Sequence, residues 1–237
     1  MIKPYNQREN KKKQVTKMFD NIAKTYDSLN NLLSLKIHLL WRKSAIKKIK
    51  KNPKTILDIG TGTGDFAIVA AKYTNAKIIG IDLSKKMIDV GKKKVLEKKL
   101  NTRITFKIAD AEKLPFKKNS FDVITSGFVV RNFENMQKGL SEIYRVLNQK
   151  GIILILEPSN PSKFPLKQIY NFYFSLVLPI IGQIISKDKK AYQYLAKSVE
   201  KFPDKNQFIL ELNKIGFKKC QHIPLSFGIA SLYIAIK

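Results

Sequence analysis

Residues 55–65, TILDIGTGTGD, decide the fold of this chain together with residues 78–82, IIGID. The first stretch predicts a short apolar strand that runs into a loop with glycine at every second position. An amphipathic helix follows, and the second stretch predicts another apolar strand, which ends in Asp82 about twenty residues after the loop. This order is typical of a βαβ unit that binds a nucleotide. The alternative is a structural βαβ unit whose glycines serve only a tight turn.

The spacing within the loop narrows the choice of ligand. Sites for dinucleotides have the pattern G-x-G-x-x-G, which places a pyrophosphate at the start of a helix. This chain has G-x-G-x-G, and Asp65 stands where the phosphate would lie. A carboxylate there repels phosphate and suits a cation, so we expect a positively charged nucleoside without phosphate. S-adenosylmethionine, with its sulfonium and amino groups, fits. Gly60 and Gly62 would let the backbone approach it, and Asp82 would accept hydrogen bonds from ribose hydroxyls.

Strand and helix patterns alternate after residue 55. This alternation predicts an α/β fold with a doubly wound, mostly parallel sheet, and 237 residues suit a single domain over 1–237. Towards the end of the chain we expect two strands around Gly228, the second as an antiparallel edge partner. The predicted strands are 55–59, 77–82, 103–108, 121–126, 151–157, 218–224 and 231–237, and the predicted helices are 65–73, 84–98, 135–147 and 206–215.

Small or acidic residues follow four of the predicted strands. They are Asp82, Asp110 with Ala111, Gly127, and Glu157 with Pro158. Because the carboxyl ends of parallel strands meet at one edge of the sheet, these residues predict a ligand crevice there.

The charge and the cysteine content limit the partners. The net charge of +27 comes almost entirely from lysine, with only five arginines. Nucleic-acid readout favours arginine and interleaved aromatic residues, so we expect no nucleic acid as partner. Transient contact with an anionic membrane surface fits lysine better. A single cysteine excludes an internal disulfide, and the polar N-terminus lacks an apolar signal core, so we expect a cytoplasmic protein, with peripheral contact at the inner face of the membrane left open.

Two segments flank or interrupt the alternation. Residues 15–40 predict an amphipathic helix broken near Asn30 and Asn31, within an N-terminal helical region 1–50. This region either packs across the sheet or forms a lid, with Tyr26 and Asp27 pointing inward. Residues 158–205 form a helical insertion, of which 172–185 is strongly apolar but too short and too broken by proline and glycine to cross a bilayer. That stretch is either a buried helix pair or an apolar cover over a lipophilic substrate.

At this point the chain resembles a known family, the ubiquinone/menaquinone biosynthesis C-methyltransferases. Several segments carry the resemblance, of which RNF combined with the N-terminal and SV…FP elements is the most specific. They are 19–30 (FDNIAKTYDSLN), 57–65 (LDIGTGTGD), 109–116 (ADAEKLPF), 131–133 (RNF), 144–147 (YRVL), 194–195 (YL), 198–199 (SV) and 202–203 (FP).

The resemblance implies a class I S-adenosylmethionine-dependent methyltransferase with a seven-stranded sheet whose last strand is antiparallel. It implies that Thr63 contacts the cofactor, that Asp82 holds the ribose, that Asp110 and Ala111 flank the adenine, and that Gly127 lies at the fourth strand end. A carboxylate at Asp110 can accept from the adenine amino group, which agrees with that assignment.

The family transfers a methyl group to a ring carbon of a prenylated quinol. Reduced demethylmenaquinone is the expected acceptor, and the benzoquinol precursor of ubiquinone is the alternative. Another small-molecule or sterol methyltransferase, and a basic membrane- or RNA-associated binding protein on the same scaffold, also remain as hypotheses. The oligomeric state stays open, a homodimer included.

Carbon is a poor nucleophile, so the acceptor must lose a phenolic proton. Arg131 and Asn132 are the candidates for stabilising the phenolate or ordering a water, and Tyr26 for contacting the hydroxyl. The alternative for Arg131 is an ion pair with Glu157 that ties two strand ends together. The two histidines, His38 and His222, have no visible partner and are expected to be structural. No grouping has metal-ligand spacing, so we expect no metal.

Overall fold

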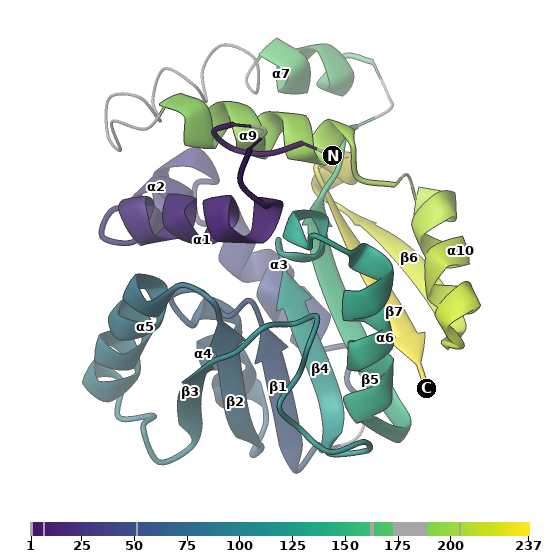
Figure 1. The fold of residues 1–237 in the computed structure, drawn as a ribbon. Helices are drawn as coiled ribbons and strands as arrows, with labels where there is room; N and C mark the ends of the chain where they lie inside the picture. The colour runs from purple at the N-terminus through teal and green to yellow at the C-terminus, as the bar shows by residue number, and fades with distance from the viewer. Residues whose placement is uncertain (1, 7, 51, 162–163, 173–188, 204) are drawn as a thin grey trace.

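The computed structural model describes residues 2–6, 8–50, 52–161, 164–172, 189–203 and 205–237. Its centre is a seven-stranded sheet in the order β3-β2-β1-β4-β5-β7-β6 (Figure 1). The first five strands run parallel, and β7 is antiparallel to both β5 and β6. The strands are β1 Thr55–Ile59, β2 Lys77–Asp82, β3 Ile104–Ile108, β4 Phe121–Gly127, β5 Leu147–Pro158, β6 Lys218–Leu225 and β7 Ala230–Ile236.

The doubly wound α/β fold predicted from the sequence is confirmed, with one correction to the strand order. The sequence predicts the last strand at an edge, but β7 lies between β5 and β6, and β6 forms the edge. The compositions explain why. Six successive residues of β7 are buried, whereas β6 carries lysine, glutamine and histidine and is largely half-buried or exposed. An almost wholly apolar strand is stable only with neighbours on both sides.

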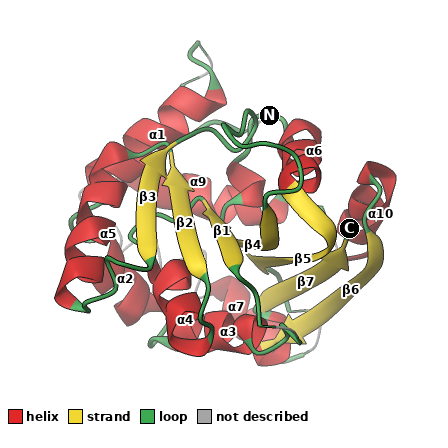
Figure 2. Ribbon diagram, turned by 90° about the horizontal axis from the view of Figure 1, so that it is seen from below, coloured by secondary structure: helices red, strands yellow, loops and turns green. Residues whose placement is uncertain are grey.

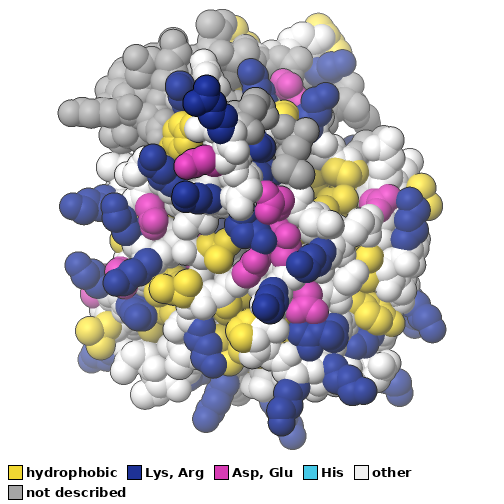
Figure 3. Space-filling model, viewed as in Figure 1, with side chains coloured by type: hydrophobic (Ala, Val, Ile, Leu, Met, Phe, Trp, Pro, Cys, Tyr) yellow, Lys and Arg dark blue, Asp and Glu magenta, His cyan; other side chains and the backbone are white. Residues whose placement is uncertain are grey.

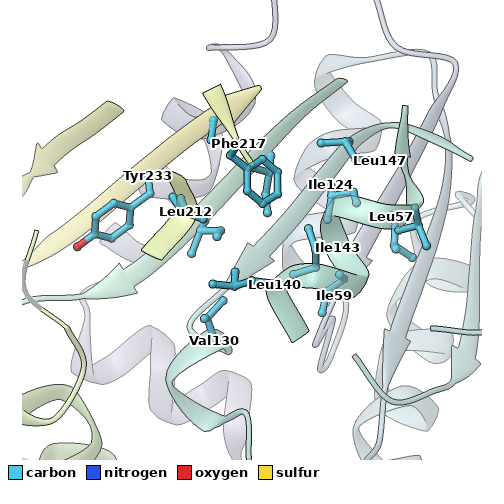
Figure 4. Packing of buried hydrophobic residues seen from close by; sticks show 14 of the residues in the cluster. Leu57, Ile59, Ile124, Val130, Leu140, Ile143, Leu147, Leu212, Phe217 and Tyr233 are labelled. Atoms are coloured by element: carbon cyan, nitrogen blue, oxygen red, sulfur yellow. The ribbon is translucent and has the colours of Figure 1, made fainter. Parts of the chain in front are cut away.

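Helices cover both faces of the sheet (Figure 2). On one face lie α3 Ile37–Ile46, α4 Asp65–Tyr73 and α5 Lys85–Glu97; on the other lie α6 Met136–Val146 and α10 Lys205–Ile215. Each face has its own apolar core. Side chains from β1, β4, α6 and α10 meet in one of them, where Leu57, Ile124, Leu140 and Leu212 are fully buried (Figure 4).

Several of these helices begin at a residue whose side chain caps the helix N-terminus. The Ser84 hydroxyl accepts from the Met87 amide at the start of α5, and the Asn135 side chain accepts from the Lys138 amide at the start of α6. Both side chains satisfy amides that the helix itself leaves unpaired.

A third layer lies beyond the carboxyl ends of the parallel strands (Figure 1). It contains α1 Lys11–Ile22, α2 Tyr26–Leu33 and α9 Lys189–Glu200, and α7 Leu166–Phe172 lies beside it. Met18, Leu29 and Tyr194 from α1, α2 and α9 form a small buried cluster of their own. The N-terminal helices are therefore held by the insertion as well as by the sheet.

The helix break predicted near Asn30 is wrong. Asn30 and Asn31 lie inside α2, and the chain breaks instead at residues 23–25 and 34–36. Leu35 and Lys36 adopt φ values of 47° and 61°, a left-handed turn made without glycine, which explains why the sequence gives no signal for it. Of the apolar stretch 172–185, all but Phe172 lies outside the described residues, so the choice between buried pair and cover is not tested. Across the described ranges, no helix combines the length and apolar character that crossing a bilayer requires.

Candidate active site

The glycine loop connects β1 to α4. Gly60, Gly62 and Gly64 have φ values of 60°, 54° and 84°, a backbone conformation that residues with a Cβ rarely adopt. A Cβ on Gly60 would also lie 2.4 Å from the methyl groups of Val129, so this glycine is required for space as well as for conformation. The loop thus brings the start of α4 close to the residues that follow β4.

A cleft opens beside this loop, between α1 and the strand ends. Its empty volume, which includes space open to solvent, is about 770 Å³. Most of the residues predicted for the site line it together, from segments far apart in sequence: Tyr26, Gly60, Gly62, Asp82, Asp110, Ala111, Gly127 and Asn132. Thr63 and Arg131 are not among the residues that line it.

The cleft is acidic although the whole chain is strongly basic. Asp82, Asp110, Glu112 and Glu134 line it, and Lys12 is the one basic side chain among its described lining residues. Figure 3 shows acidic side chains gathered near the middle of this face, with lysines spread over much of the rest. A cleft of this charge favours a cationic ligand over a phosphate.

Asp82 is held in place by the backbone. Its carboxylate accepts from the amides of Gly62 and Ser84, each at 2.9 Å. Each oxygen has a further lone pair, so the carboxylate can still accept from a diol. Burial raises the pKa of Asp82 against the effect of these two amides.

Lys12 of α1 reaches across the cleft to two carboxylates. Its ammonium lies 2.7 Å from Asp110 Oδ2 and 3.2 Å from Glu112 Oε2. The second oxygen of Asp110 accepts from the Glu112 amide, and Glu112 also accepts from the Glu134 amide. Lys12 therefore fastens α1 to the loop after β3.

A second group of polar contacts joins α2 to the glycine loop. The Thr63 hydroxyl donates to Asp27 at 2.6 Å, and Lys94 Nζ lies 2.6 Å from both Asp27 and Asp65. The sequence predicts that Asp65 faces a cationic ligand, and this is wrong, because its carboxylate is turned to Lys94 and does not line the cleft. Burial alone would raise the pKa of Asp65, but the charges of Arg42 and Lys94 lower it. Asp27, which the lid hypothesis expects to point into the cleft, does not line it either, because its carboxylate contacts Thr63 and Lys94.

Arg131 makes the ion pair with Glu157 that the sequence left as the alternative. The distance from Arg131 Nη1 to Glu157 Oε2 is 2.7 Å, and both side chains are buried. Arg131 Nε also donates to Ser198 Oγ at 3.2 Å. Burial raises the pKa of Glu157, against the charge of Arg131. The 3₁₀ turn η1 Val130–Asn132 is thereby tied to the end of β5.

The rest of this turn is held by hydrogen bonds from α1 and α9. Lys11 Nζ donates to the carbonyls of Arg131 and Phe133, each at 2.8 Å. Asn132, which lines the cleft, accepts at Oδ1 from the Tyr194 hydroxyl at 3.0 Å. Tyr26 also lines the cleft, and burial raises the pKa of its hydroxyl. Tyr26 is therefore a neutral hydrogen-bonding group at neutral pH.

Both histidines have structural partners. His38 Nδ1 lies 2.7 Å from Arg42 Nη1, which can only donate, so Nδ1 accepts and Nε2 donates to Asn31 Oδ1 at 3.1 Å. Burial and the Arg42 charge lower the pKa of His38 to about 4, which keeps the ring neutral. His222 lies 2.8 Å from Ser231 Oγ, on the strand pair β6 and β7. Neither ring lines the cleft.

Sequence reasoning missed Lys11, Lys12, Arg42 and Lys94 as parts of this region. All four lie on helices within lysine-rich stretches, where nothing in the pattern separates a buried basic residue from a solvated one. In the part of the chain that the structure describes, no group of three or more histidine, cysteine or carboxylate side chains could hold a metal ion.

Comparison with known proteins identifies relatives over the full length. A family model described as the ubiE/COQ5 methyltransferase family matches residues 7–237. A demethylmenaquinone methyltransferase of Bacteroides fragilis is 44% identical over 100% of this chain and 97% of its own length. A ubiquinone/menaquinone biosynthesis C-methyltransferase UbiE of Geotalea daltonii is 44% identical over 96% and 97%.

The fold also matches solved structures. The crystal structure of a putative S-adenosyl-L-methionine-dependent methyltransferase of Methanococcus maripaludis superposes with a TM-score of 0.69 at 25% identity, covering 98% of this chain and 97% of that chain.

Proposed function

Since this chain belongs to the ubiE/COQ5 methyltransferase family, we propose that it methylates a ring carbon of reduced demethylmenaquinone in menaquinone biosynthesis. The methyl donor is S-adenosylmethionine. The observation that carries the choice of acceptor is the similarity, over the whole chain, to demethylmenaquinone methyltransferases of several bacteria.

The acidic cleft supports the donor assignment. S-adenosylmethionine supplies a methyl group activated by a positively charged sulfur, and four carboxylates around the cleft suit that charge. Asp82 is the residue for the ribose hydroxyls, and Asp110 with Ala111 for the adenine. Gly60, Gly62 and Gly127 leave room for the ligand at the backbone. Thr63 supports the loop through Asp27 instead of lining the cleft.

The acceptor chemistry needs a proton removed and the remaining charge stabilised. Asn132 and Tyr26 line the cleft and can hydrogen-bond a quinol hydroxyl. Arg131 is adjacent in sequence to Asn132, which lines the cleft. It carries a permanent positive charge, which would lower the free energy of a phenolate. Its partner Glu157 fixes the guanidinium in one orientation. Arg131 is thus proposed to act through its charge and not as a base.

A benzoquinol precursor of ubiquinone is the second candidate acceptor. The relative from Geotalea daltonii carries both quinones in its name, at the same 44% identity as the Bacteroides fragilis protein. Because a prenylated quinol resides in the bilayer, we also propose that the protein works in the cytoplasm, at the inner face of the membrane, with lysines in contact with anionic lipid.

The test is methyl transfer by the purified chain from radiolabelled S-adenosylmethionine to each acceptor, reduced and oxidised, in detergent. We expect label in reduced demethylmenaquinone and none in the oxidised form, because only the quinol can become a phenolate. Label in the benzoquinol alone would contradict the role in menaquinone biosynthesis and assign the protein to ubiquinone biosynthesis. Label in neither acceptor, together with salt-sensitive retention of RNA, would contradict an enzymatic role.

A further inference from the structure

Arg42 is a buried cation without a carboxylate partner. Its side chain, on α3, is only 5% exposed. Among the described residues no carboxylate oxygen lies within 4.0 Å of the guanidinium, and Nε has no hydrogen-bond partner at all. An unpaired buried charge costs several kcal/mol. A ligand that supplies the missing anion would remove that cost.

The groups around Arg42 are already engaged. Nη1 donates to the His38 carbonyl and to the neutral His38 ring. Asp58 is near enough for the Arg42 charge to lower its pKa, but its two oxygens accept from the hydroxyls of Thr61 and Thr125. The Arg42 charge also lowers the pKa of Asp65, but the Asp65 carboxylate is in ion-pair contact with Lys94. The guanidinium itself lies over the ring of Phe128, 5.1 Å from its centroid.

The free Nε is buried behind the wall of the cleft. It lies 3.9 Å from the point where a Cβ on Gly127 would stand, and both Gly127 and Phe128 line the cleft. The Phe66 ring is nearer still, 3.1 Å from the same point, so the glycine at 127 leaves the guanidinium close behind the cleft wall without a Cβ beside it. An acid group placed there would meet a charged N–H donor, and arginine is the side chain best matched to a carboxylate.

We propose that Arg42 binds the α-carboxylate of the methionine part of S-adenosylmethionine through the space beside Gly127. The methyl donor has one anionic group, and the rest of the cleft is acidic, so the carboxylate needs a separate cationic partner. The phenolate of the acceptor also carries an anionic oxygen that Arg42 could bind. The experiment below separates the donor carboxylate from the acceptor phenolate. The inference rests on the donor alone, so a different acceptor would leave it intact.

The experiment measures binding by calorimetry, without turnover. The ligands are S-adenosylhomocysteine, its decarboxylated analogue, which keeps the adenosine, the sulfur and the amino group, and, in a separate titration, reduced demethylmenaquinone. We expect the native protein to prefer S-adenosylhomocysteine. Arg42→Met should weaken S-adenosylhomocysteine about ten- to hundred-fold, the value of a charge-assisted hydrogen bond, and leave the analogue within about two-fold. Lys43→Met, the next residue on α3, is the matched control and should change neither affinity.

A second variant keeps the test valid if Arg42→Met does not fold. Gly127→Ala retains the guanidinium but places a methyl group 3.9 Å from Nε and 3.1 Å from the Phe66 ring, and it should reduce the preference for the carboxylate. Equal weakening of both ligands by Arg42→Met, or an unchanged preference in both variants, would overturn the proposal. Unchanged donor affinity with weakened quinol binding would assign Arg42 to the acceptor and overturn it as well.

Discussion

Arg131 has a structural contact in addition to the role in the chemistry that we propose for it. Its ion pair with Glu157 joins the turn after β4 to the end of β5, and both side chains are buried. A buried pair contributes little net stability, but removal of one partner leaves an unpaired charge and costs about 3–5 kcal/mol. Loss of activity in a single Arg131 variant therefore does not separate a structural role from a catalytic one.

A paired substitution does separate them. Arg131→Met should lower the free energy of unfolding by about 3–5 kcal/mol, and Arg131→Met with Glu157→Gln should recover most of that loss, because no unpaired charge remains. If Arg131 stabilises the phenolate, both variants lose turnover while the donor dissociation constant stays unchanged. Urea unfolding and steady-state kinetics measure these quantities. Recovery of turnover together with stability in the double variant would show that the pair is only structural.

At the scale of elements, the N-terminal helices are fastened to the sheet by polar contacts across the cleft. Lys12 joins α1 to the loop after β3, and Asp27 joins α2 to the glycine loop. About a quarter of the Lys12 side chain is exposed, so its ion pairs are partly screened and each contributes no more than about 1 kcal/mol. The Lys12 contacts can therefore break locally while the apolar contacts of α1 and the sheet remain in place.

We expect Lys12→Met to increase the hydrogen exchange of the α1 amides by up to about five-fold, because the local opening free energy falls by no more than about 1 kcal/mol. Amides of β1 and β4 should not change. Lys13→Met is the matched control, since the neighbouring Lys13 pairs only with Glu9, at 3.6 Å, and is 74% exposed. Equal exchange in both variants and in the native protein would mean that the Lys12 contacts do not hold α1.

The sequence predicts these elements unevenly, for physical reasons. The parallel strands and α4 to α6 are found to within a few residues, because alternating apolar runs and capping residues are local signals. The break at Leu35 and Lys36 is missed because nothing but tertiary packing imposes that left-handed turn. The strand ends predict most of the cleft. The Lys12–Asp110 and Lys94–Asp65 ion pairs are missed because each joins segments that lie far apart in the sequence.

For the whole molecule, charge is distributed to suit two partners. The chain carries a net charge of +27, yet the charged residues that line its cleft are four carboxylates and one lysine. If the protein works at an anionic membrane, as we propose, lysines spread over the surface would attract it without requiring defined contacts, and the acidic cleft would keep its preference for a cation.

The charge predicts how the protein associates with membranes. Sedimentation with vesicles of phosphatidylglycerol should retain the protein at low salt and release it at high salt, since surface charges are screened beyond a Debye length of about 10 Å at 0.1 M salt. Vesicles of phosphatidylcholine, which carry no net charge, serve as the control. Equal retention on both lipids, or none on either, would contradict the electrostatic account.

The central claim is that the cleft transfers a methyl group to carbon on a reduced quinol. The most direct measurement uses S-adenosylmethionine with an isotopically labelled methyl carbon and reduced demethylmenaquinone, followed by NMR of the extracted product. The account predicts a single labelled methyl group bonded to a carbon of the quinone ring. A labelled methoxy group, or recovery of all label in the donor, would contradict it.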